Sequence, residues 1–377
     1  MDWKTLRLSL RSLSAYRGLL ERNVMKCALT LLDALCAEND EEAAACRAEL
    51  FYRLRLDGQT KLSGWLLERM RFDEEPYPLL VESGGSDPAL EDAARRDVAS
   101  LAALVSAVTN EKCEDLDFDS LTDFYRRHGA GMFAKYRAFV WEKGTLRPVE
   151  QPDAPEEREL LGYERQREAV VNNTRAMLAG HAVNNVLLYG DSGTGKSATV
   201  KSLLAVEGLD DLRIIELQKD DLSGMSDLLP LLKNRRQKFI LFIDDLAFDQ
   251  DDKTYSMLKS ILEGGLEPRP ANVAIYATSN RRNLVRQTFS DRSGDEVDAA
   301  ETVQEKTALA DRFGLRVAYL PLNKAEFLAL VDGLAALEGV EMDTVQLHAE
   351  AVKWEARHPG RTPRTARQFI AGIKTYG

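Results

Sequence analysis

The sequence predicts an α/β fold in which helices cover both faces of a parallel sheet, with an all-helical region before it and a small helical region after it. Apolar residues recur at steps of three and four through most of residues 1–150. Short apolar runs then alternate with helical stretches up to residue 322, and helical spacing returns over residues 323–377. We therefore expect three domains, formed by residues 1–150, 151–322 and 323–377.

The N-terminal region opens on a pattern typical of one long amphipathic helix, whose apolar face comprises Leu13, Tyr16, Leu20, Val24, Cys27, Leu31 and Leu35. Proline, glycine and acidic residues in 71–88 predict an internal loop. Helical spacing then resumes and continues through residues 133–141. We expect the aromatic residues of that stretch in the core of the helical domain rather than on a base-stacking surface: Phe133, Tyr136, Phe139 and Trp141. Residues 144–159, rich in proline and acid, predict a linker.

Composition restricts the class of protein. The chain has 377 residues, 44% of them hydrophobic, and a formal net charge of −11. Such a chain can bury sizeable cores, and its acidic balance argues against a protein that coats nucleic acid. The N-terminus lacks the apolar core of a signal peptide, and no run of about 18 apolar residues occurs, so we expect a cytoplasmic protein without a membrane span.

Five short apolar runs predict the strands of the parallel sheet. Strands buried on both faces of such a sheet read as continuous apolar runs. The runs are Val186–Tyr189, Leu212–Leu217, Phe239–Ile243, Val273–Thr278 and Leu315–Leu320.

A glycine-rich turn follows the first of these runs and precedes a helical pattern. Its residues are Gly190, Asp191, Ser192, Gly193, Thr194, Gly195, Lys196 and Ser197, which fit the phosphate-binding pattern G-x-x-x-x-G-K-S/T. The glycines let backbone N–H groups point at phosphate oxygens, and the following helix adds its positive N-terminal end. We expect Lys196 to reach the β- and γ-phosphates and Ser197 to bind Mg²⁺.

Polar residues end two further runs and complete a nucleotide-hydrolysing set. Asp244 and Asp245 follow the run Phe239–Ile243, where we expect Asp244 to bind Mg²⁺ and Asp245 to orient or deprotonate the attacking water. Asn280 follows the next run and can hold the same water. A GTPase is disfavoured, because Ala247 stands where its switch glycine belongs. The guanine-motif near miss that starts at Asn323 predicts the start of a helix instead.

The order of these motifs resembles that of AAA+ ATPases, from about residue 160 to the C-terminus. That resemblance implies the sensor-1 role for Asn280, an arginine finger at Arg312 and the sensor-2 role for Arg364. The stretch Glu159–Val170 resembles the segment whose backbone lines the adenine pocket, which implies contacts from Leu161 and Gly162. The helix that begins near Arg364 is similar to the lid helix of the bacterial Holliday-junction branch-migration motor.

A closer resemblance covers nearly the full chain. Residues 128–141, 242–249, 290–292 and 311–315 are similar to an uncharacterised bacterial AAA+-type ATP-binding family, domain of unknown function eight-fifteen. Within the wider class this resemblance implies an αβα sandwich, ATP and Mg²⁺ as ligands, a helical lid, and self-assembly into a ring or stacked oligomer such as a hexamer. The helical N-terminal domain is then the region that meets an unknown protein partner.

The expected function is an ATPase that couples Mg·ATP binding and hydrolysis to remodelling of a macromolecular partner. AAA+ chains usually carry Asp-Glu where this chain has Asp244-Asp245, and the shorter second side chain predicts slow hydrolysis. Two alternatives remain open. One is an assembly or binding module that ATP controls with little turnover. The other is a DNA-remodelling or loader ATPase, which the basic cluster Arg281, Arg282, Arg286 and Arg292 would serve, although nucleic acid is not favoured.

Overall fold

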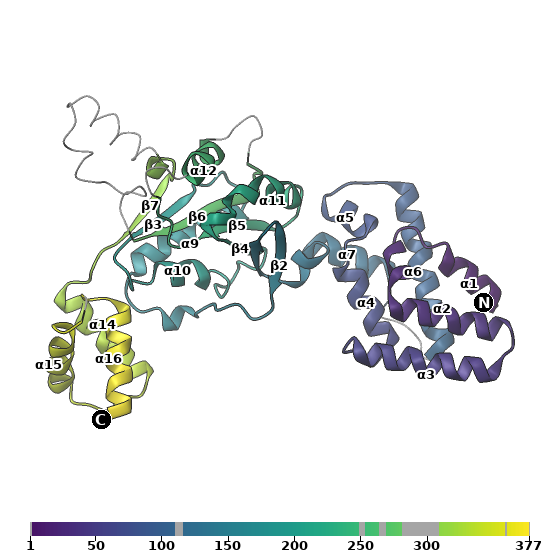
Figure 1. Ribbon diagram of the computed structural model, residues 1–377, viewed down its shortest axis with the longest axis horizontal. Coiled ribbons are helices and arrows are strands. Elements are labelled where there is room, and N and C mark those ends of the chain that lie inside the picture. Colours follow the sequence, from purple (N-terminus) through teal and green to yellow (C-terminus); the bar gives the residue numbers. More distant parts are fainter. Residues whose placement is uncertain are drawn as a thin grey trace. The chain divides into compact units, whose positions relative to one another are not determined.

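The computed structural model describes residues 2–109, 116–248, 253–263, 269–280, 309–358 and 360–376 (Figure 1). The chain forms two compact units. Unit 1 comprises Met1–Tyr136 and Asn234–Gln237, and unit 2 comprises Arg137–Lys233 and Lys238–Gly377. The division falls after Tyr136, so the segment up to residue 150 lies with the sheet and not with the helical region in which composition places it.

The regular secondary structure of unit 1 consists of helices over the residues described. Its elements are α1 Trp3–Arg11, the 3-10 helix Arg17–Glu21, α2 Asn23–Cys36, α3 Asp40–Leu56, α4 Leu62–Phe72, α5 Pro76–Glu82, α6 Pro88–Thr109, α7 Phe118–His128 and α8 Met132–Lys135. The loop predicted over residues 71–88 contains α5, which begins at a proline in the first helical turn, where a missing N–H costs nothing.

The single long helix predicted through residues 13–35 is wrong. A 3-10 turn and the single helix α2 replace it, and α1 already ends at Arg11. The cause is Asp97, whose carboxylate accepts the backbone N–H groups of Ser14, Ala15 and Tyr16 at 2.9, 2.9 and 3.2 Å. Those three amides are therefore not available to a helical ladder. Asp97 is buried on α6, so the break is fixed by a residue more than 80 positions away.

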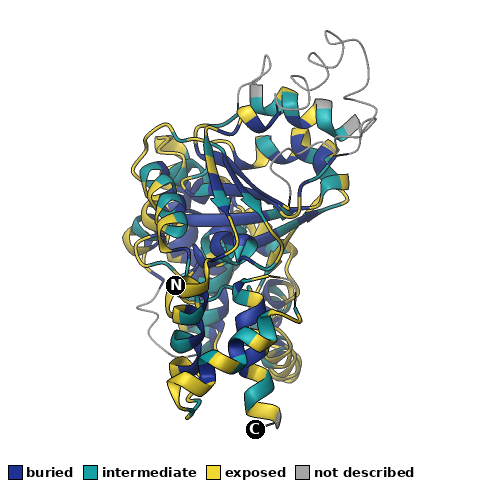
Figure 2. Cartoon of the chain, turned by 90° about the vertical axis from the view of Figure 1, so that its left-hand side faces the viewer, coloured by how far each residue is buried: buried dark blue, intermediate teal, exposed yellow. Residues whose placement is uncertain are grey.

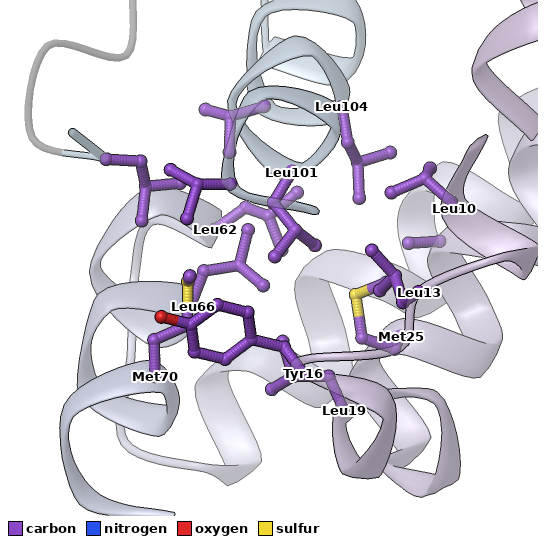
Figure 3. Close-up of a cluster of buried hydrophobic side chains, with 14 of the residues drawn as sticks. Leu10, Leu13, Tyr16, Leu19, Met25, Leu62, Leu66, Met70, Leu101 and Leu104 are labelled. Atoms are coloured by element: carbon purple, nitrogen blue, oxygen red, sulfur yellow. The ribbon is translucent and has the colours of Figure 1, made fainter. Parts of the chain in front are cut away.

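The core of unit 1 gathers aliphatic side chains from α1, α2, α4 and α6 around one tyrosine (Figure 3). Tyr16 is fully buried, and its hydroxyl lies 3.1 Å from the hydroxyl of Tyr125. Tyr125 in turn donates to the backbone oxygen of Met70 at 2.8 Å. Both phenols are thus hydrogen-bonded inside the core, as buried hydroxyls usually are.

Unit 2 is built on a seven-stranded sheet in the order β2-β1-β4-β5-β6-β3-β7. Of the strand pairs described, only β1–β2 is antiparallel; the other pairs are parallel. The strands are β1 Ala138–Glu142, β2 Thr145–Val149, β3 Val186–Gly190, β4 Leu212–Leu217, β5 Lys238–Ile243, β6 Val273–Ser279 and β7 Leu315–Tyr319. The five predicted runs correspond to β3 to β7, and the strands of the sheet centre are buried (Figure 2).

The hairpin β1–β2 was not predicted. The sequence predicts a helix through residues 138–141 and a linker that includes residues 145–149, and both predictions are wrong. A two-residue turn at Lys143 and Gly144, both with positive φ (50° and 76°), closes the hairpin, and β1 pairs with β4. Phe139 and Trp141 therefore lie buried in unit 2, so their placement in the helical core is wrong.

Four helices flank the sheet, and three more form a separate group at the C-terminal end of unit 2, among the helices described (Figure 1). They are α9 Glu164–Leu178, α10 Lys196–Ser202, α11 Met225–Leu232 and α12 Lys253–Glu263, then α14 Lys324–Leu337, α15 Thr344–Glu355 and α16 Pro363–Tyr376, with 3-10 turns at Glu157–Glu159 and Lys219–Gly224. The last three helices pack on one another. Asn323 and Glu326 form a capping box at the start of α14, which confirms the predicted helix start. Of the helices described, none has both the length and the apolar character needed to cross a membrane.

Parallel pairing brings the polar segments to one edge of the sheet. In β3 and β6, Leu188 is paired with Thr278; in β3 and β7, Gly190 is paired with Tyr319. The glycine-rich turn, the Asp244–Asp245 pair and Asn280 therefore follow the carboxyl ends of β3, β5 and β6. In open parallel sheets, ligands bind at this edge.

Candidate functional site

The glycine-rich turn is held in a form that only glycine allows. Gly190 has φ +138°, and a Cβ there would lie 2.0 Å from the backbone oxygen of Tyr319. Gly193 and Gly195 have φ of +80° and +93°. Thr194 closes the turn, since its hydroxyl donates to the backbone oxygen of Asp191 at 2.8 Å.

Lys196 lies at the centre of the turn and is 6% exposed. Its ammonium donates to the backbone oxygens of Gly190 and Asp191 at 2.8 and 2.7 Å and to Oδ1 of Asn280 at 3.0 Å. Burial lowers the pKa of this ammonium, and nearby carboxylates act in the opposite direction. The lysine therefore joins the glycine-rich turn to the end of β6.

A hydrogen-bonded network links the polar ends of the strands. Oδ1 of Asp244 accepts from the hydroxyls of Ser197 at 2.6 Å and Thr278 at 2.5 Å. The Thr278 hydroxyl accepts in turn from the backbone N–H of Asp245 at 2.9 Å. Nδ2 of Asn280 donates to Oδ1 of Asp245 at 2.7 Å. Each polar group of the set thus has a defined orientation.

Asp245 has a left-handed backbone with φ +52°. Aspartate tolerates this region better than most residues do, yet such a backbone persists only where its surroundings impose it. Here the hydrogen bonds to Thr278 and Asn280 impose it. The residue with this strained backbone is the one expected to act on the attacking water.

The start of α16 meets the glycine-rich turn. The backbone N–H of Arg364 donates to the backbone oxygen of Gly193 at 3.2 Å, and Nη1 of Arg364 donates to Oγ of Ser192 at 3.3 Å. One turn later, Arg367 donates to the backbone oxygen of Glu159. Two arginines of one helix therefore hold two separate segments.

An aromatic and apolar recess adjoins the turn. The rings of Tyr163 and Tyr319 lie 4.9 Å apart at 31°. Burial raises the pKa of each phenol to about 12, so both are neutral at pH 7. The hydroxyl of Tyr163 donates to the backbone oxygen of Leu320 at 2.5 Å, and that of Tyr319 lies 2.8 Å from Oγ1 of Thr199.

These groups surround one cavity of about 620 Å³. It is lined by Asp153, Pro155, Leu160, Ser192, Gly193, Gly195, Lys196, Ser197, Ala198, Asp244, Asp245, Thr278, Asn280, Pro363, Arg364, Arg367 and Gln368. The smaller recess, of about 30 Å³, shares Leu160, Gly195, Pro363 and Arg367 with it and also contacts Leu161, Gly162 and Tyr163. The larger volume suits a nucleotide-sized ligand.

Comparison with known families shows which family the chain belongs to. Residues 134–376 match the family described as "Protein of unknown function (DUF815)". The chain belongs to this family. The match covers the sheet, the cavity and the three C-terminal helices of this DUF815 member, and its P-loop module is of the AAA+ type.

Curated relatives of this DUF815 member are "Holliday junction branch migration complex subunit RuvB" proteins. That of Solibacter usitatus is 30% identical over 220 residues, covering 53% of this chain and 54% of its own. That of Prochlorococcus marinus is 28% identical over 202 residues, covering 53% and 52%. The chain thus spans about half the length of the curated relatives it matches.

Solved structures similar to this DUF815 member include two of RuvB from Thermotoga maritima. The Holliday junction branch migration motor is 18% identical, with a TM-score of 0.41, over 57% of this chain and 62% of that one. A point mutant of the same RuvB gives 18% identity and a TM-score of 0.42 over 59% of this chain and 66% of that one.

Most residues singled out in the sequence of this DUF815 member lie at the two adjoining cavities. Arg312 lies elsewhere. It is exposed three residues before β7, at the amino end of that strand, whereas the cavity lies at the carboxyl ends. The basic cluster that begins at Arg281 lies outside the described residues.

Several residues that line the main cavity are not among those that the sequence predicts for the site. Thr278 carried a usable signal, since it is a hydroxyl residue two positions before Asn280 at the end of a predicted strand. Arg367 shares a helix face with Arg364, three positions earlier, and that spacing could have identified it. Asp153 and Pro155 belong to the expected linker, and nothing in their pattern indicated a cavity wall.

Proposed function

We propose that this chain binds Mg·ATP in the cavity and hydrolyses it slowly, as an AAA+ ATPase. One observation carries the proposal: Lys196, the acidic pair and the side-chain amide of Asn280 form one network of hydrogen bonds, completed by Thr278, at the carboxyl edge of a parallel sheet. Such a set is what phosphoryl transfer requires, because its catalysis consists of positioning and charge stabilisation. The recess beside Leu161 and Gly162 is the proposed adenine site.

The residues at the turn suit Mg²⁺. Ser197 and Asp244 offer a hydroxyl and a carboxylate oxygen 2.6 Å apart, which are the hard oxygen ligands that Mg²⁺ prefers alongside substrate phosphates. When bound, Mg²⁺ would neutralise charge on the phosphates. Thr278 fixes the orientation of the carboxylate, so the same oxygen of Asp244 stays directed at Ser197.

In the proposed hydrolysis, each remaining residue of the site has one role. Asp245 takes a proton from water as the water oxygen bonds to the γ-phosphorus and the bond to the β–γ bridging oxygen breaks. Asn280 fixes Asp245 and contacts Lys196, so it couples the water side to the phosphate side. Arg364 reaches the turn from α16 as the sensor-2 group. Arg312, outside the cavity, is the proposed finger for the γ-phosphate of a neighbouring subunit.

The proposed use of this cycle is remodelling of a macromolecular partner by a ring or stacked oligomer, most simply a hexamer. The names of the curated relatives, which are subunits of a branch migration complex, support assembly. The helical N-terminal domain is the proposed partner-binding region, and residues 323–377 are the proposed lid.

Single-turnover hydrolysis with protein in excess over ATP tests this function. We expect phosphate release by the wild type and none by Asn280→Ala, with ATP binding retained in both. Thr344→Ala in the lid, away from the cavity lining, serves as the control. A wild type that binds ATP tightly and releases no phosphate would refute the ATPase and leave the assembly module.

Two alternatives each have one observation in their favour: an assembly module with little turnover, and an ATPase that acts on DNA. The short side chain of Asp245 favours a module with little turnover, whereas Asn280 and Arg312 favour hydrolysis. The relatives' names favour action on DNA. Hydrolysis measured with single-stranded and duplex DNA over a salt series decides the second, because nucleic-acid binding through phosphate contacts weakens steeply as salt rises.

A further inference from the structure

The segment Asp153–Leu160, which precedes Leu161 and Gly162 of the smaller recess, lines the main cavity. Composition predicts a proline-rich linker over residues 144–159, yet Asp153, Pro155 and Leu160 line the main cavity. Ala154 packs against the core of unit 2. Residues 157–159 form a 3-10 turn closed by a capping box between Glu156 and Glu159. The segment therefore has its own local structure and a fixed face toward the cavity.

Arg367 is what holds this wall to the C-terminal helices. Its guanidinium donates to the backbone oxygen of Glu159, next to Leu160. Arg367 also lines both the main cavity and the smaller recess, and so does Leu160. A guanidinium has five donors in a rigid fork, so one bonded carbonyl does not use up the donors of this cavity-lining side chain.

The same helix also contacts the glycine-rich turn. Arg364 bonds the glycine-rich turn through its backbone N–H and its side chain. Three residues apart on α16, Arg364 and Arg367 lie on one helix face. A ligand that draws α16 toward the turn therefore also acts on residues 153–160, through the hydrogen bond from Arg367 to the backbone oxygen of Glu159.

We propose that Arg367 is a positioning residue that holds the segment Asp153–Leu160 as a wall of the nucleotide site, so that nucleotide binding stabilises this segment further. The proposal rests on ATP binding in the cavity but not on hydrolysis. Residues 153–160 then contact the nucleotide directly, between the proposed phosphate site and the proposed adenine site.

Hydrogen–deuterium exchange on the full chain, with and without Mg²⁺ and a non-hydrolysable ATP analogue, tests the proposal. We expect the analogue to slow exchange in peptides covering residues 153–160 as well as in the glycine-rich turn. In Arg367→Ala the turn stays protected, the effect on residues 153–160 is lost, and affinity falls roughly tenfold, as for one charge-assisted hydrogen bond. Arg367→Lys retains a donor and restores part of the effect.

Lys374→Ala is the matched control, because Lys374 lies on the same helix, is exposed, and pairs with Glu338 outside both cavities. It should behave as the wild type. Protection of residues 153–160 that is unchanged in Arg367→Ala overturns the proposal, as does a wild type in which only the turn responds. If the analogue does not protect the turn itself, the proposed nucleotide site is wrong and this inference falls with it.

Discussion

Replacing Thr278 with valine isolates the hydroxyl that organises the acidic pair. The hydroxyl donates to Asp244 at 2.5 Å and accepts from the backbone of Asp245 at 2.9 Å, and Thr278 is 2% exposed. Valine keeps the β-branched shape that the strand requires but offers neither bond. A hydrogen bond to a charged group contributes about 1.5–3 kcal/mol, so hydrolysis should slow roughly 10- to 100-fold.

The assay is single-turnover hydrolysis over a Mg²⁺ titration. Thr278→Val should need more Mg²⁺ for half-maximal rate, because Asp244 is no longer held toward Ser197. Affinity for ATP in the absence of Mg²⁺ should not change, since the hydroxyl of Thr278 bonds the acidic pair and not the glycine-rich turn. Thr278→Ser retains the hydroxyl and should stay within a few-fold of the wild type. Wild-type rate and Mg²⁺ dependence in Thr278→Val would refute the network as the organiser of the site.

Three further predictions follow from other residues. Arg312→Ala should bind ATP normally and lose hydrolysis, and mixing it with Lys196→Ala should restore part of the phosphate release, because an intact finger then meets an intact site; a wild-type rate in Arg312→Ala alone contradicts this. Because burial lowers the pKa of Lys196 and bound phosphate favours its ammonium, ATP binding at alkaline pH should take up protons and weaken before exposed lysines titrate; calorimetry in two buffers of different ionisation enthalpy measures the uptake. Burial raises the pKa of Glu75 in unit 1, so its contribution to stability is present below the ordinary glutamate pKa and is lost as pH rises through the folded-state value. Glu75→Gln should therefore melt at a higher temperature than the wild type near pH 7 and show little difference near pH 4.

The parallel strands were predictable because burial on both faces leaves a continuous apolar run. Phe239–Ile243 is such a run, and β5 starts one residue earlier. The hairpin β1–β2 was not, because residues 138–142 alone fit a helix as well as a strand. Their pairing with β4, some 75 positions away, decides the outcome. The break between α1 and α2 likewise depends on Asp97, which no local pattern connects to Ser14.

The same distinction applies to the site. The glycine-rich turn and the acidic pair are contiguous motifs whose backbone chemistry can be read locally. Contacts such as Arg364 to Ser192 and Arg367 to Glu159 join positions 172 and 208 residues apart. Only the fold shows that the linker is a cavity wall.

Titration calorimetry of Mg·ATP into the wild type and Lys196→Ala tests most directly the claim that this cavity binds the nucleotide. Lys196 is the cation that would meet the β- and γ-phosphates, and Lys353→Ala, which removes an exposed lysine paired with Glu350 on α15, controls for lost charge. We predict wild-type binding, unchanged binding in Lys353→Ala, and affinity lower by roughly a hundredfold, about 2.7 kcal/mol, in Lys196→Ala. Equal Mg·ATP affinity in the wild type and Lys196→Ala would contradict the assignment of the site.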